Sequence, residues 1–219
     1  MPMPSTPMRT PMLNDCPQIG LRIGRRTALG LGAAAAAVAL MPGAALALTD
    51  AQARALIERA VADVNAAISS GKTGPALYAD FERLFSRYAD VPVIARSALG
   101  PAARSASAAQ MVAFTTAFQG YLSRKYGKRF REFIGARFEV TGARPVKTFF
   151  EVKSTAIFPG QAPFEVLWQV SDKSGRDLFF NLIIEGVNML ATERTEIGAM
   201  LDRRRGDLDA MIVDLKTAG

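Results

Sequence analysis

The hydrophobic period of the chain changes at Gly135, and this change constrains the fold more than any other feature. Before it, apolar side chains recur at helical spacing, as in Phe114, Phe118 and Leu122. After it, apolar and polar residues alternate, as they do along 164–171. A period near 3.6 is typical of an amphipathic helix, and a period of two is typical of a half-buried strand. Helical spacing returns after residue 188, so the order is helices, strands, helices, which predicts an α+β fold.

The expected elements follow from this spacing and from the Gly, Pro and Ser breaks between runs. Helices are expected at 49–69, 76–88, 92–99, from 105 to about 134, 189–204 and 207–217. Strands are expected at 137–146, 148–158, 164–171 and 177–185. We expect the N-terminal helices to pack on a curved four-stranded antiparallel sheet, with the C-terminal helices following it in a cone-like domain.

The first 47 residues have the pattern of a cleaved export signal. Arg25-Arg26 precedes an apolar Ala-rich run, and Ala45-Leu46-Ala47 fits a small-x-small cleavage site. The run is shorter than the ~20 apolar residues that a membrane span needs. The arginine pair favours a twin-arginine signal. We therefore expect a periplasmic protein whose single domain covers 48–219; the alternative is an Ala-rich structural helix.

The domain lacks the residue types that most hydrolytic mechanisms use. The chain has no histidine, and its one cysteine, Cys16, lies in the expected signal. This argues against Ser-His and Cys-His nucleophiles and against zinc sites built on His or Cys. No metal, cofactor or catalytic residue is expected. The formal net charge of +7 includes the signal's arginines, so it does not by itself favour nucleic acid as a partner.

A basic cluster lies at the end of the long helix expected before Gly135. Cations favour a helix C-terminus, so a solvated helix end is one interpretation. The other is a docking or headgroup site for anionic lipid or an acidic partner. The cluster consists of Arg124, Lys125, Lys128, Arg129 and Arg131.

Large apolar side chains are unusually frequent on the strands and on the long helix. Two interpretations remain open: a sheet covered on both faces, or a sheet and helices that enclose an apolar ligand cavity. The residues predicted to line such a cavity are Phe114, Phe118, Tyr121, Leu122, Phe150, Val166, Trp168, Phe180, Leu182 and Ile184. A one-residue error in register would turn the strand residues to the other face.

The order of several short motifs resembles the MlaC-type periplasmic phospholipid-binding proteins, also called the toluene-tolerance family. The motifs are Asp80-Phe81, Ala98-Leu99-Gly100, Arg104, Ala106, Gln110, the apolar positions from Phe114 to Tyr126, Ile184-Glu185-Gly186-Val187-Asn188 and Arg194. The family usually has a tryptophan between Gly100 and Arg104, and Tyr-Arg where this chain has Glu193-Arg194. The chain thus resembles a divergent member.

The resemblance implies a shuttle that holds phospholipid acyl chains in a cavity between helices and sheet. Such proteins pass lipid between an outer-membrane lipoprotein complex and an inner-membrane ABC transporter with its substrate-binding subunit. They use no cofactor and bind no nucleic acid. A hopanoid or other triterpenoid is the alternative cargo.

Glu185-Gly186 interrupts the apolar run 181–190 and admits two interpretations. A structural role at the junction of strand and helix, with Glu185 accepting backbone N–H groups or pairing with Arg194, is favoured. The alternative is an enzyme on the same scaffold that uses Glu185 and Arg194. A separate hypothesis is an acid pair such as glycosidases use, formed by two of Glu139, Glu151, Glu165 and Glu185; the alternative is that these glutamates lie on solvated strand faces.

Overall fold

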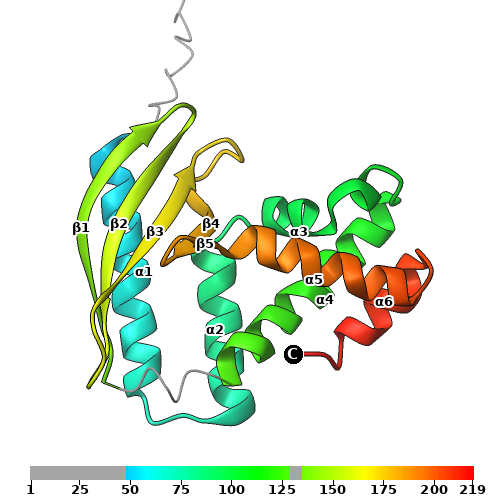
Figure 1. Cartoon of the computed structure of the whole chain (residues 1–219), viewed down its shortest axis with the longest axis horizontal. Coiled ribbons are helices and arrows are strands. Elements are labelled where there is room, and N and C mark those ends of the chain that lie inside the picture. Colours follow the sequence, from blue (N-terminus) through cyan, green and yellow to red (C-terminus); the bar gives the residue numbers. More distant parts are fainter. Residues whose placement is uncertain (1–47, 129–134) are drawn as a thin grey trace, which may run out of the picture. The chain divides into compact units, whose positions relative to one another are not determined.

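A computed structural model describes residues 48–128 and 135–219, and these residues form a mixed helical and antiparallel fold (Figure 1). The helices are α1 (Asp50–Ser69), α2 (Gly74–Tyr88), α3 (Val91–Leu99), the 3-10 helix η1 (Gly100–Arg104), α4 (Ala108–Gly127), α5 (Met189–Arg203) and α6 (Leu208–Leu215). The strands are β1 (Arg137–Val146), β2 (Phe149–Ile157), β3 (Phe164–Ser171), β4 (Leu178–Ile184) and β5 (Val187–Asn188). The predicted α+β class is confirmed.

The differences from the predicted elements are small and local. The sheet has a fifth strand, β5, which the sequence did not predict because two residues show no alternation. Helix α4 ends at Gly127, and residues 129–134, which the prediction placed in this helix, lie outside the described residues. The expected export signal, residues 1–47, lies outside the described residues.

Polar residues fix where the helices begin. The Thr49 and Ser107 side chains each accept a hydrogen bond from the third helical residue, whose glutamine side chain accepts from the cap backbone. These capping boxes satisfy donors that the first turn of a helix leaves free. Asn188 and Asp207 cap α5 and α6 through single side-chain bonds.

The strands follow one another across the sheet in the order β1-β2-β3-β4-β5, all antiparallel. Val152 lies opposite Trp168, and Trp168 lies opposite Leu182, so these three side chains share a face. Helix α1 contacts β1, β2 and β3, while α3 and α5 contact β4. Within this face the Trp168 indole Nε1 donates to the hydroxyl of the fully buried Ser154 at 2.9 Å. That bond satisfies two polar groups that would otherwise be costly to bury.

Glu185-Gly186 forms the two-residue loop of a hairpin between β4 and β5. Ile184 pairs with Val187 across it, and both loop residues have positive φ, 48° for Glu185 and 80° for Gly186. Positive φ at both central residues is the type I′ turn, which matches the twist of antiparallel strands. The chain therefore turns back into the sheet before it enters α5, where the sequence had suggested a direct passage from strand to helix.

None of the helices within the described ranges is long and apolar enough to span a lipid bilayer.

We predict that Gly186→Ala lowers the free energy of unfolding by about 1 kcal/mol, because an L side chain is strained at this φ. A Cβ at Gly186 would meet no atom within 4 Å, so the loss reflects backbone conformation alone. Glu185→Asn should have a free energy of unfolding equal to or above that of the wild type, since Asn adopts positive φ more readily. Urea unfolding measures both changes. An unfolding free energy that Gly186→Ala leaves unchanged would contradict the turn assignment.

Candidate functional site

Three aromatic rings form a buried row along α4. The ring centroids of Phe114 and Phe118 are 5.5 Å apart, and those of Phe118 and Tyr121 are 6.1 Å apart, both stacked. Phe114 and Phe118 are fully buried, and Tyr121 is 2% exposed. Leu122 extends the row and is also buried. These four predicted lining residues therefore all face the interior.

The predicted strand residues meet this row in the same apolar cluster. Val166 and Trp168 are buried in it, and Phe150, Phe180, Leu182 and Ile184 are half-buried against it. All ten predicted lining residues thus belong to one apolar cluster or pack against it, and this cluster also contains residues of α1, α3, α5 and α6. Their role as the lining of a lipid cavity stays a prediction.

Phe180 differs from the other strand residues in its position. The register of β3 and β4 shifts between Gln169 and Val170, where Val170 lies opposite Phe179 and Gln169 lies opposite Asn181. Phe180 is the extra residue of this bulge. Its ring packs edge-on against that of Phe149, 5.5 Å away. Simple alternation along β4 does not predict this contact, because a bulge changes the direction of side chains locally.

A polar network joins α4 to α5 at the end of the aromatic row. The Lys125 ammonium lies 2.7 Å from Oε1 of Glu193 and 2.5 Å from Oε2 of Glu196. The Tyr121 hydroxyl donates to Glu196, and the Tyr126 hydroxyl donates to Glu193. Glu193 is 4% exposed, and its second oxygen accepts no hydrogen bond from the described residues. The network therefore places two carboxylates and one ammonium between packed helices.

The electrostatics of this network keep Lys125 and Glu196 charged and the tyrosines neutral. Burial opposes the charge on Lys125, but hydrogen bonds to Glu193 and Glu196 outweigh it and raise the pKa of Lys125. Burial likewise opposes the charge on Glu196, but hydrogen bonds from Lys125 and Tyr121 hold the pKa of Glu196 below its usual range. Burial, followed by the hydrogen bonds to the carboxylates, raises the pKa of Tyr121 and Tyr126.

The basic cluster at the end of α4 is largely engaged within the chain. Arg124 donates to the backbone oxygens of Leu215 and Ala218, and Lys128 donates to that of Gly219. Lys125 belongs to the network with α5. Arg129 and Arg131 lie outside the described residues. The predicted docking role stays a prediction, and three of its five cations have intramolecular partners.

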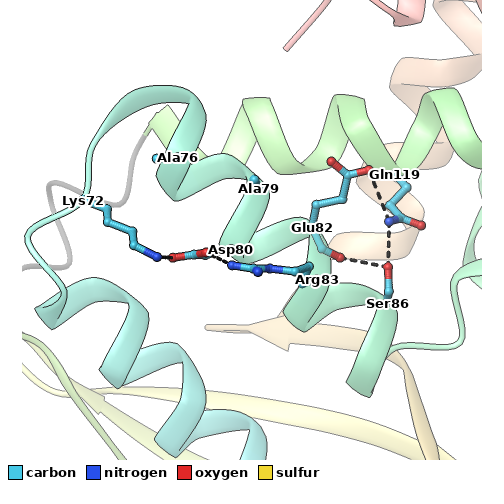
Figure 2. Close-up of a pocket in the computed structure, with 8 residues that line it drawn as sticks. All are labelled: Lys72, Ala76, Ala79, Asp80, Glu82, Arg83, Ser86 and Gln119. Carbon is cyan, nitrogen blue, oxygen red and sulfur yellow. Dashed lines mark hydrogen bonds and ion pairs between the residues drawn. The ribbon is translucent and has the colours of Figure 1, made fainter.

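A surface hollow with a volume of about 640 Å³ lies beside α2 and α4. Its lining is Lys72, Ala76, Ala79, Asp80, Glu82, Arg83, Ser86 and Gln119. Figure 2 shows the side chains of Lys72 and Arg83 reaching Asp80 from opposite sides, and Gln119 facing Glu82 and Ser86. None of the ten predicted apolar lining residues borders it.

Asp80 is the central group of this hollow. A hydrogen bond from Lys72 and the nearby Arg83 outweigh burial and lower the pKa of Asp80. The sequence analysis assigned Asp80 only to a motif and did not select Lys72 or Arg83. The spacing of Asp80 and Arg83 on one helix was a usable signal for their pairing. Lys72 precedes the helix, so periodicity does not reveal its contact.

Of the glutamates that a carboxylate-pair enzyme would need, only Glu165 and Glu185 are shown as neighbours, since the Glu185 backbone N–H donates to the Glu165 backbone oxygen at 3.1 Å. Glu139 pairs with Arg137, Glu151 with Arg144 and Glu165 with Lys153. Glu185 is exposed on the hairpin loop.

No ion pair joins Glu185 to Arg194 among the residues that the structure describes, so the expected pairing of these two is wrong. The Arg194 side chain packs instead on Gly100, where a Cβ would lie 3.0 Å from Nε. Within 48–128 and 135–219, no three His, Cys, Asp or Glu side chains come together as metal ligands.

We predict that Lys125→Met lowers the free energy of unfolding by about 3 kcal/mol, because it leaves two carboxylates of the network without their counter-charge. Lys153→Met is the matched control, since Lys153 and Glu165 are both about half exposed. Exposed pairs contribute about 0–1 kcal/mol, so the control should change little. Equal effects of the two substitutions in urea unfolding would contradict a structural role for the network.

We also predict that Glu196 stabilises the fold above its unfolded pKa of about 4.3 and that this contribution is lost as the pH falls through its lowered folded pKa. The difference in unfolding free energy between wild type and Glu196→Gln should therefore shrink with acidification. Urea unfolding at a series of values between about pH 7 and pH 3 measures it. A difference that does not change with pH would show that Glu196 acts without its charge.

A comparison with protein-family models matches residues 55–217 to the MlaC protein family. A solved structure of a phospholipid-binding protein from Ralstonia solanacearum, in complex with a phospholipid, has the same fold with a TM-score of 0.60. Its sequence is 21% identical, and the match covers 74% of this chain and 98% of that one. The matched family residues include α4, the whole sheet and α5, and thus all ten predicted lining residues and the polar network. The chain belongs to the MlaC family.

Proposed function

We propose that this protein is a carrier that binds a phospholipid by its acyl chains and performs no catalytic step. The observation that carries the proposal is the main apolar cluster, in which the aromatic row of α4 meets the inner face of the sheet, in a chain of the MlaC family. The fold relative from Ralstonia solanacearum, itself phospholipid-bound, supports the cargo class. Burial contributes about 0.8 kcal/mol per methylene, so an apolar interior is sufficient to extract a lipid without chemistry.

The half-buried members of the cluster mark the place where acyl chains would enter. Phe150, Leu182 and Ile184 lie on the inner face of the sheet and are partly exposed, whereas Phe114 and Phe118 on α4 are fully buried. An apolar ligand that covers these residues removes their remaining exposed apolar area from water, which stabilises the complex. We assign the entrance to this strand side of the cluster.

The proposed setting is the periplasm, reached through the cleaved twin-arginine signal in residues 1–47. There the carrier would exchange lipid with an outer-membrane lipoprotein complex and with an inner-membrane ABC transporter through its substrate-binding subunit. The absence of histidine and of cysteine from 48–219 is compatible with a protein that only binds its cargo. A hopanoid is the second candidate cargo.

We predict that protein purified from the periplasm shows, in native mass spectrometry, an added mass that extraction identifies as phospholipid. Leu182→Glu and Ile184→Glu should lose this mass, because they place a charge at the proposed entrance. Val93→Glu is the matched control, since Val93 is 42% exposed and lies on α3, outside the sheet. It should keep the cargo.

An extracted triterpenoid would replace the phospholipid assignment with the hopanoid one. A protein that is empty and accepts no lipid from phospholipid vesicles would contradict the carrier. Loss of cargo in all three variants would contradict the assigned entrance.

A further inference from the structure

A second hollow lies on α4 beside the end of α6, away from the polar hollow at Asp80. Its volume is about 370 Å³, and its lining is Ala113, Thr116, Ala117, Gly120, Arg124 and Lys216. Five of these residues recur on one face of α4, so they form a strip about 16 Å long. The strip is about the length of three helical turns. We refer to it as the α4 groove.

The floor of the α4 groove is made of small side chains, and each of the two helices that line it carries an exposed valine. Val112 is 69% exposed and lies one turn from Thr116, whose hydroxyl donates to the Val112 backbone oxygen. Val213 is 61% exposed and lies one turn before Lys216 on α6. These two valines are among the most exposed large apolar residues described. Small residues flanked by exposed apolar ones permit close approach of another helix.

One end of the α4 groove is positively charged. Arg124 has its Nη1 beside Gly120, and its other nitrogens donate to backbone oxygens and not to a carboxylate. Lys216 has no ion pair within the described part of the chain. The two acids of α6 have other partners: Asp209 accepts a hydrogen bond from Gln110, and Asp214 accepts one from Arg204.

We propose that the α4 groove is a docking site for an acidic amphipathic helix of a partner protein, with small apolar residues on its inner face. Its acidic end would lie at Arg124 and Lys216, where opposite charge gives orientation and speeds association. A second copy of this chain would bring the same cations together, so charge disfavours it. The proposal does not depend on which lipid the protein carries.

The test uses the full-length exported protein and a fluorescein-labelled helical peptide of about 18 residues, with Ala and Val on one face and Glu on the other. A second peptide carries Lys in place of Glu. Fluorescence anisotropy should show binding of the acidic peptide alone, weakened by added salt. We expect Thr116→Trp, which fills the groove from an exposed position, and Lys216→Glu each to weaken binding at least about tenfold.

Lys173→Glu is the matched control, an exposed lysine on the turn between β3 and β4, and it should leave the affinity unchanged. Equal binding of both peptides, no binding of the acidic peptide, or an unaffected Thr116→Trp would overturn the proposal. Binding to phosphatidylglycerol vesicles, or self-association in sedimentation, that Thr116→Trp abolishes would assign the groove to a membrane or to a second copy instead. Thr116→Trp and Lys216→Glu should retain the lipid mass of the wild type, which separates this result from the carrier proposal.

Discussion

The ammonium of Lys125, held between the carboxylates of Glu193 and Glu196, fixes the position of α5 against α4. Helix α5 continues directly from β5, the last strand of the sheet. The same interaction therefore sets the distance between the aromatic row of α4 and the edge of the sheet. Tyr121 belongs to both systems, since its ring stacks on Phe118 and its hydroxyl donates to Glu196. An apolar contact could supply similar stability, but it would not define one direction of approach.

Much of the fold follows from the sequence because its signals are local. The change of period at Gly135, the caps Thr49 and Ser107 and the alternation along β3 each depend on a few neighbouring residues. The same alternation placed Val166 and Trp168 on the inner face. Strand β5 was not predicted, because two residues are too few to show a period. The positive φ of both Glu185 and Gly186 is what a two-residue hairpin loop ordinarily requires.

The polar sites were less accessible to prediction because their partners are distant along the chain. Composition identified the cations at 124–128, yet Lys125 pairs with residues about 70 positions away and Arg124 with backbone more than 90 positions away. Local sequence gives the charge of such a cluster, whereas tertiary contacts decide whether that charge faces solvent. The α4 groove had no sequence signal of its own, since small residues on a helix face are common in helix packing as well.

The apolar cluster has two roles that compete for the same residues. Phe114 and Phe118 are fully buried, so replacing either would create a cavity and lower stability by about 3–5 kcal/mol whether or not lipid binds. Leu182 and Ile184 are only half-buried, and their contribution to the core is correspondingly smaller. A carrier must keep its fold when empty and yet open its interior to acyl chains. The fully buried side of the cluster meets the first requirement, and the half-buried strand side is where the second can be met with the least loss of packing.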